Sequence, residues 1–161
     1  MSTAGPSPDG RYIASAEGDR SRIEHWDAKS LTSIAVVEDP EGQLPLHGIR
    51  VLAFDQSGET LFSGARDGSL IAWDTATRSI RARLIGHSDA VDAIVCSHDG
   101  RRIITGGWDR TVRFWDMKTF ENVFVSTKHY GRVRTVAQSK DGRRLLSTGV
   151  DSPIFLFDRG W

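Results

Sequence analysis

Histidines, hydroxyl residues and aspartates could act in catalysis, and in this chain they recur in the same order. The clearest group is His87, Thr105 and Asp109, in which a hydroxyl could attack a carbonyl, an imidazole could take its proton and a carboxylate could orient the imidazole. Similar groups occur in two other stretches, although an enzyme needs one triad, and there is no Gly-x-Ser-x-Gly elbow or obvious oxyanion-hole loop. The sequence therefore predicts a protein that is not an enzyme.

The spacing of the possible ligand residues indicates neither a metal site nor a nucleotide site. The five histidines lie far apart along the chain, at positions 25, 47, 87, 98 and 129. The single cysteine, Cys96, permits neither an internal disulfide nor a cysteine-based zinc site. Gly106 and Gly107 are followed by Trp108 rather than by the Lys-Ser or Lys-Thr of a phosphate-binding loop. We expect no metal and no cofactor.

Composition limits the class of protein further. The chain has 161 residues, of which 39% are hydrophobic, with 21 basic and 21 acidic side chains and no formal net charge. That length fits one domain with a sizeable core, and the neutral balance does not favour bulk attraction to nucleic acid. No apolar run approaches the length of a membrane span, and residues 1–6 lack the features of a secretory signal. The expectation is an intracellular domain, cytoplasmic or nuclear, without a membrane partner.

Three marks repeat along the chain with a nearly constant period. A Trp-Asp pair occurs three times and returns as Phe157-Asp158, with spacings of 47, 42 and 42 residues. Turns that end in Gly and single histidines recur in step with these pairs. The repetition predicts one domain over residues 1–161 with four units, approximately 7–37, 47–84, 87–126 and 129–158.

Within each unit the pattern indicates short strands. Val91, Ala93 and Val95 alternate with Asp92 and Ile94, and such runs are bounded by Gly, Asp and Ser. No segment has an apolar 3.6-residue period of useful length. We expect an all-β chain with four strands in a full unit, near 49–54, 60–64, 70–74 and 79–84 in the second.

Taken together, the Gly86-His87 pair, the turn aspartates and the Trp-Asp pairs resemble the WD-repeat β-propeller family over nearly the whole chain. The resemblance implies four-stranded antiparallel blades arranged radially about a channel. It also implies a buried hydrogen-bonded set of His, Ser or Thr, Asp and Trp in each blade. Those sets are His47, Ser63, Asp67 and Trp73; His87, Thr105, Asp109 and Trp115; and His129, Ser147 and Asp151.

Two units depart from this pattern. Phe157 replaces the last tryptophan and lacks its N–H donor, so the fourth network should be one bond short. The first unit has Ser15, Asp19 and Trp26 but no preceding histidine, and its longer Asp-to-Trp spacing predicts a bulged hairpin. The strand count also predicts an open, incomplete propeller. The first unit should begin at its second strand, Arg11–Ser15, and the last should end at its third, Pro153–Phe157.

The resemblance also indicates one face for partner binding, formed where the inner strands begin and by the residue before each turn aspartate. Transferred to this chain, those positions are Arg50, Leu52 and Arg66; Ala90, Asp92 and Trp108; and Arg132, Arg134 and Val150. Strand periodicity places Arg132 and Arg134 together, away from the face of Val133, and treats Arg50 and Leu52 in the same way. Arginine and tryptophan are enriched among interface hot spots, although ordinary solvated charges are the alternative.

Charge is distributed unevenly along the chain. Residues 1–47 carry 4 basic and 8 acidic side chains, whereas residues 128–161 carry 7 and 3. Ends of opposite charge would favour head-to-tail association. The acidic connection at 38–46 would mimic an acidic ligand beside the arginines. Unselected surface variation and a tolerated loop insertion are the plainer explanations.

The expected function is a non-catalytic protein–protein interaction scaffold that presents loops of WD-repeat blades. Its expected partners are proteins or acidic or phosphorylated peptides, with self-association or a larger complex as further options. Two alternatives stay open: a fragment of a larger propeller without independent function, and a chromatin or nucleic-acid reader that uses the arginine-rich face. The zero net charge does not favour nucleic acid.

Overall fold

The computed structural model of the chain describes residues 3–17, 22–38, 48–150 and 153–158. Within these ranges the chain forms strands and turns, which confirms the all-β prediction. Nowhere in that part of the chain is there a helix long and apolar enough to cross a membrane. His47, Asp151, Asp19 with its hairpin, and the acidic connection beyond Glu38 lie outside the described residues.

Fifteen strands in the described ranges form four antiparallel sheets. The first sheet contains β1 (Thr3–Pro6), β2 (Tyr12–Ala16), β3 (Arg22–Asp27) and β4 (Ser33–Glu38). The second contains β5 (Ile49–Phe54), β6 (Thr60–Ala65), β7 (Leu70–Asp74) and β8 (Ile80–Leu84). The third contains β9 (Val91–Cys96), β10 (Arg102–Gly107), β11 (Val112–Asp116) and β12 (Asn122–Ser126). The fourth contains β13 (Val133–Gln138), β14 (Arg144–Gly149) and β15 (Phe155–Asp158).

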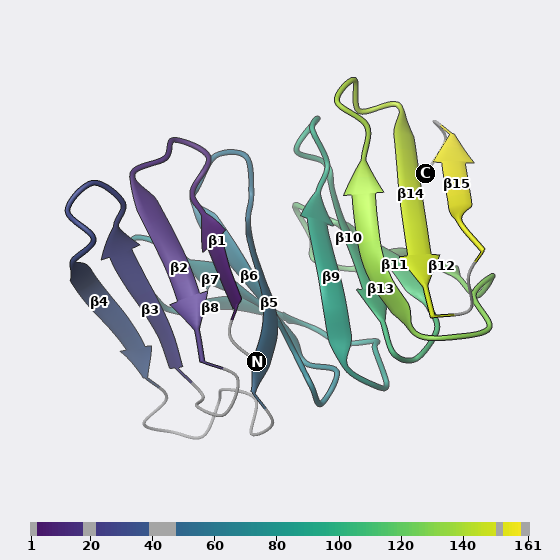
Figure 1. Ribbon diagram of the computed structural model, residues 1–161, viewed down its shortest axis with the longest axis horizontal. Helices are drawn as coiled ribbons and strands as arrows, with labels where there is room; N and C mark the ends of the chain where they lie inside the picture. The colour runs from purple at the N-terminus through teal and green to yellow at the C-terminus, as the bar shows by residue number, and fades with distance from the viewer. Residues whose placement is uncertain (1–2, 18–21, 39–47, 151–152, 159–161) are drawn as a thin grey trace.

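The sheets follow one another as the blades of a partial propeller (Figure 1). Each chain-consecutive strand pairs with its neighbour, so every sheet is a simple meander from the inner strand outward. The inner strands β1, β5, β9 and β13 lie beside one another in that order. Because side chains alternate along a strand, successive sheets present apolar faces to each other.

Three apolar clusters fill the spaces between successive sheets. Ile23 and Leu61 belong to the cluster between the first and second sheets, and Phe62 and Ile103 to the next. The third cluster joins the third and fourth sheets around the fully buried Phe114, whose ring meets that of Phe157 edge-on, with centroids 5.7 Å apart. Apolar burial between successive sheets is therefore the main contribution to the stability of the four packed sheets.

The first unit differs from the prediction because its inner strand is present. β1 pairs with β2 through Thr3↔Ala16 and Pro6↔Ile13, so the predicted absence of this strand is wrong. The strand consists of Thr, Ala, Gly and Pro, which lack the β-branched apolar alternation by which strands are recognised. A Cβ atom at Gly5 would lie 3.3 Å from the carbonyl oxygen of Leu52, so glycine lets β1 approach β5 closely.

Candidate functional site

The inner strands of three sheets share one irregularity near their first residues. The pairing register shifts between Ile49 and Val51 in β5 and between Val133 and Thr135 in β13, and β9 shows the same shift opposite Gly106 and Gly107. The residues passed over are Arg50, Asp92 and Arg134, which stand 42 residues apart. A bulge of this kind turns its extra side chain out of the regular alternation. Here the bulges turn Arg50, Asp92 and Arg134 toward one opening at the start of the inner strands. We call this opening, with Trp108 and Arg132, the mouth.

Asp92, from the middle of the three sheets, connects these side chains. Its Oδ1 accepts a hydrogen bond from Nε of Arg50 in the preceding sheet. Its Oδ2 accepts from Nη1 of Arg134 in the following sheet at 2.9 Å and from the indole N–H of Trp108 at 2.6 Å. The Asp92 side chain is 8% exposed, so a buried carboxylate ties three consecutive blades together.

Trp108 forms the apolar part of the same cluster. The guanidinium carbon of Arg132 lies 3.7 Å from a ring centroid of Trp108, and those of Arg50 and Arg134 lie at 4.8 and 5.2 Å. These distances are within the range of cation–π attraction. The backbone N–H of Trp108 also donates to the carbonyl oxygen of Ala90 at 2.7 Å, which fixes the turn above the start of β9.

The electrostatics of this cluster favour negative charge. Burial alone would raise the pKa of Asp92, but hydrogen bonds from Arg50 and Trp108 and the charge of Arg134 lower it below the usual value. The carboxylate is therefore ionised at neutral pH. The cluster contains three guanidinium groups and this one carboxylate, and the Arg134 side chain is 45% exposed while Arg132 is also exposed. The mouth therefore keeps positive charge that faces solvent.

Other residues predicted for this face lie differently. Leu52 is 6% exposed and belongs to the core between the first two sheets, so its placement on the binding face is wrong. The bulge at Arg50 is the reason, because it breaks the alternation that paired Leu52 with Arg50. Arg66 is exposed, and its backbone N–H donates to Gly48. Ala90 is buried, and Val150 is exposed.

The third unit contains a complete hydrogen-bonded set. The indole N–H of Trp115 donates to Oγ1 of Thr105 at 2.9 Å, and Nε2 of His87 lies 2.7 Å from the same hydroxyl. Nδ1 of His87 lies 2.8 Å from the Asp109 carboxylate. A neutral imidazole protonated at Nδ1 satisfies every contact, because the threonine hydroxyl then donates to Nε2 and Nδ1–H donates to Asp109. Burial would raise the pKa of Asp109, but the hydrogen bond and charge of His87 and two hydrogen bonds from Thr111 together outweigh burial and lower the pKa to about 2.

In the other units, the described residues form further bonds of this kind, while His47 and Asp151 lie outside the described residues. Trp73 donates to Ser63 and Trp26 donates to Ser15, both at 2.8 Å. Nε2 of His129 lies 2.8 Å from Oγ of Ser147. The carboxylate of Asp67, which is exposed, accepts from the backbone N–H of Ser69.

The arrangement of the third set does not resemble a working triad. The Thr105 hydroxyl is completely buried and engaged by both Trp115 and His87, so no substrate carbonyl can reach it. Burial raises the pKa of the Cys96 thiol to about 12, with the charge of Asp55 adding to the effect, so this thiol stays protonated and is a poor nucleophile. The described residues include no group of three or more His, Cys, Asp or Glu side chains that could hold a metal ion.

His25 is a buried polar residue for which the sequence predicted no role. His25 precedes Trp26 in β3, at the position that Ala72 and Phe114 occupy before their tryptophans, and it is 7% exposed. A histidine in a register that is otherwise apolar is the signal by which the sequence could have revealed it.

Comparison with known proteins places repeats on part of the chain. The family described as "WD domain, G-beta repeat" matches residues 38–74 and 78–116. The chain is 32% identical to Autophagy-related protein 16 of Arabidopsis thaliana over 90 residues, which is 56% of this chain and 16% of that protein. It is 36% identical to WD repeat, SAM and U-box domain-containing protein 1 of Danio rerio over 72 residues, 45% of this chain and 14% of that protein. The chain thus spans a small part of the length of these relatives, and the predicted WD-repeat resemblance is confirmed.

Proposed function

We propose that this chain, a WD-repeat protein by its matched repeats and its blade-like sheets, is a non-catalytic scaffold whose arginine-lined mouth binds an acidic segment of a partner protein. WD40 repeats generally serve in protein–protein interaction. The finer part of the proposal, the acidic partner, rests on the cluster around Asp92. We place the protein inside the cell, in the cytoplasm or the nucleus.

The observation that carries the proposal is the way Asp92 is bound. Two guanidinium groups and one indole N–H already converge on this carboxylate. The cluster is therefore a built example of carboxylate recognition, in which planar guanidinium groups offer paired donors. Arg132 and the outer edge of Arg134 remain accessible to a second carboxylate, which would meet them beside the Trp108 ring.

Charge arithmetic supports an acidic ligand over a neutral one. The cluster contains three guanidinium groups against one carboxylate, so a bound acid would reduce an existing excess of positive charge. Each charge-assisted hydrogen bond to a partly desolvated carboxylate contributes about 1.5–3 kcal/mol. Two such bonds from Arg132 and Arg134 would give a peptide ligand a clear preference for this mouth.

The test compares matched peptides and matched variants by isothermal titration calorimetry. A Glu-rich peptide should bind, the same peptide with Gln in place of Glu should not, and affinity should fall with added salt. The double variant Arg132→Gln/Arg134→Gln should lose at least about tenfold in affinity, the loss of about 1.4 kcal/mol. Its control is Arg101→Gln/Arg143→Gln, which removes the same charge from exposed turns at the opposite ends of the inner strands.

Two results would overturn the proposal. Equal binding of the Glu and Gln peptides would show that charge is not recognised. Equal losses in both double variants would show that overall charge, and not this mouth, attracts the peptide. Tighter binding of generic duplex DNA than of the acidic peptide would favour a nucleic-acid reader instead.

A further inference from the structure

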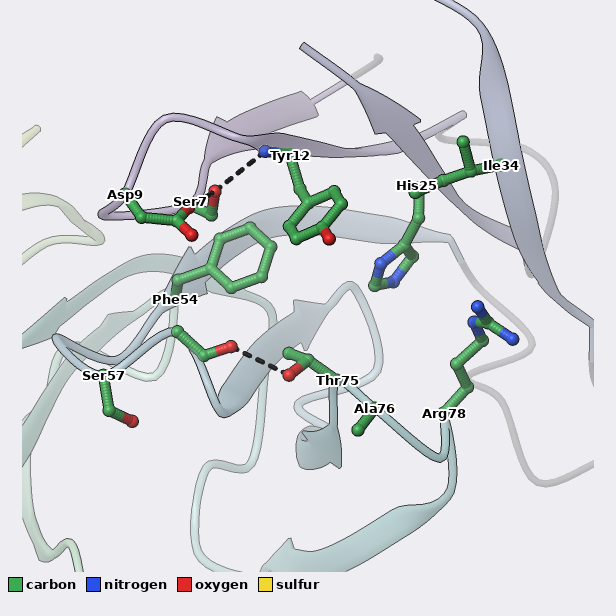
Figure 2. Close-up of a pocket in the computed structure, with 11 residues that line it drawn as sticks. Ser7, Asp9, Tyr12, His25, Ile34, Phe54, Ser57, Thr75, Ala76 and Arg78 are labelled. Carbon is green, nitrogen blue, oxygen red and sulfur yellow. Dashed lines mark hydrogen bonds between the residues drawn. The ribbon is translucent and has the colours of Figure 1, made fainter.

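A cavity of about 310 Å³ lies between the first two sheets, at the ends of the inner strands opposite the arginine cluster. The β1–β2 turn with residues of β2, β3 and β4 forms one side (Figure 2). The end of β5, the β5–β6 turn and the β7–β8 turn form the other. This volume is at the lower end of the range for small-molecule sites. A small ligand therefore fits the cavity by size.

His25 supplies the first sign that the cavity is built for a polar ligand. Its side chain lines the cavity and is 7% exposed, and no residue in the described ranges forms a hydrogen bond with its imidazole. The imidazole nitrogens of His25 are not among the fully buried atoms that lack a partner in the described residues, so they are open to the cavity and available to a ligand. Burial, with a smaller contribution from the charge of Arg78, lowers the pKa of His25, so the imidazole is neutral and offers one donor and one acceptor.

Arg78 supplies the second sign. Figure 2 shows its guanidinium turned toward the His25 ring across the cavity. Among the described residues no carboxylate forms an ion pair with Arg78, whereas Arg81 of the same hairpin is bound to Asp74. The acid on the cavity wall, Asp9, accepts hydrogen bonds from Ser7 and from the backbone of Arg11, whose guanidinium lies 3.5 Å from its second oxygen. The uncompensated charge in this cavity is therefore positive.

Three apolar or aromatic side chains, Tyr12, Ile34 and Phe54, form another part of the wall. Figure 2 shows the rings of Tyr12 and Phe54 and the side chain of Ile34 along the cavity. Tyr12 is 41% exposed and Ile34 is 48% exposed, which is unusual for side chains of their size at a contact between blades. A planar apolar body in the cavity would cover both.

We propose that this cavity is a binding site for a small aromatic carboxylate, whose acid group pairs with Arg78 and accepts a hydrogen bond from His25 while its ring packs on Tyr12 and Phe54. A single guanidinium matches the planar, singly charged carboxylate better than a phosphate dianion, whose second charge would find no partner in the cavity. The ligand gives His25 the hydrogen bond that the described protein residues do not supply.

The test uses benzoate as the probe and amide chemical shifts of the isotopically labelled chain as the readout. A ligand of about nine non-hydrogen atoms should bind with a Kd of roughly 1 mM. Its shifts should be confined to the elements that line the cavity, which are the β1–β2 turn, the start of β2, β3, β4, the end of β5 with the β5–β6 turn, and the β7–β8 turn. Benzamide, which has the same shape without the charge, should bind at least about tenfold more weakly because it lacks the charge-assisted bond to Arg78.

Four variants separate the proposed contacts from general effects. Arg78→Gln should weaken benzoate at least about tenfold, and Arg110→Gln should leave it unchanged because it removes an arginine from another turn with a similar positive φ. His25→Leu places an apolar residue in a register that is apolar in the next units, so it should fold and bind benzoate severalfold more weakly. Arg132→Gln/Arg134→Gln should not alter benzoate binding, which keeps this test independent of the arginine cluster.

The proposal is overturned if benzoate and benzamide bind equally or if Arg78→Gln binds benzoate as well as the unaltered chain does. It is also overturned if shifts appear at the Asp92 cluster instead of the cavity. Tighter binding of phenyl phosphate than of benzoate would reject the carboxylate as the ligand class.

Discussion

The third and fourth units share a strand register but differ in the polar core of the blade. Trp115 faces Ile103 across its sheet, and Phe157 faces Leu145 at the same point of the next. In the third unit the indole completes a chain of hydrogen bonds through Thr105 and His87 to Asp109. In the fourth, Phe157 has no N–H to donate. The strands therefore pair in the same register with and without the indole hydrogen bond. We infer that apolar packing determines the register and that the hydrogen bond adds stability.

The first unit extends this comparison. Its Trp26 donates to Ser15 at 2.8 Å, as Trp115 donates to Thr105 in the third unit. The bond from tryptophan to a hydroxyl is thus common to the first three units, whereas the described histidine contacts occur only in the third and fourth. Each added partner should increase the stability of its own blade, and variants can measure these increments.

The largest expected difference is at the indole itself. Trp115 is 1% exposed, so Trp115→Ala should reduce the free energy of unfolding by about 3–5 kcal/mol. Phe157 is only half-buried, so Phe157→Ala should cost about half as much. Urea unfolding of both variants measures the two values. A cost for Trp115→Ala below about 0.5 kcal/mol, the range of ordinary surface changes, would contradict the alignment of the units.

The next difference concerns the shared hydroxyl. Thr105→Val keeps the shape of the side chain but leaves both the Trp115 N–H and His87 Nε2 without a partner, so it should cost about 2–4 kcal/mol. Ser147→Ala removes the hydroxyl that contacts His129 and leaves no indole behind, so it should cost about 1–2 kcal/mol. Equal costs in the same unfolding assay would show that the third network is no stronger than the fourth.

A third difference should be visible in acid. The folded-state pKa of Asp109, about 2, lies below its ordinary value of 3.8. Its stabilising contribution is therefore complete above about pH 4 and is lost as the pH falls toward 2, and it amounts to about 2 kcal/mol. Asp109→Asn should flatten this part of the stability curve, as measured by urea unfolding between pH 2 and 5. An unchanged slope would show that Asp109 does not provide the acid dependence.

These comparisons also explain what the sequence could predict. Turn glycines and Trp-Asp pairs are local marks, so the second unit's strands were predicted within about one residue of the observed bounds. The strand β1 was missed because Thr3–Pro6 carries no apolar alternation. The burial of Leu52 was missed because a bulge at Arg50 has no side-chain signature in the sequence.

The site shows the same division. The family resemblance predicted that Arg50, Asp92 and Arg134 share one face, yet their contact through one carboxylate depends on how three sheets converge. Such convergence is a property of the packed sheets, because the residues lie 42 positions apart and no local pattern links them. His25 and Arg78 likewise line one cavity because the first two sheets pack together.

The smallest expected effect comes from adding the missing indole to the fourth unit. Phe157→Trp would place an N–H where the tryptophans of the first three units reach their hydroxyls, at 2.8–2.9 Å. A groove beside Phe157, lined also by Phe124 and Lys128, leaves space for the larger ring. The change should therefore be neutral or stabilise the chain by up to about 1 kcal/mol, the usual net value of one hydrogen bond. Ser147→Ala provides the control, because the gain should disappear when the acceptor is removed. A gain that persists in the Ser147→Ala background would come from added apolar area, and the indole bond would then count for little in any of the blades.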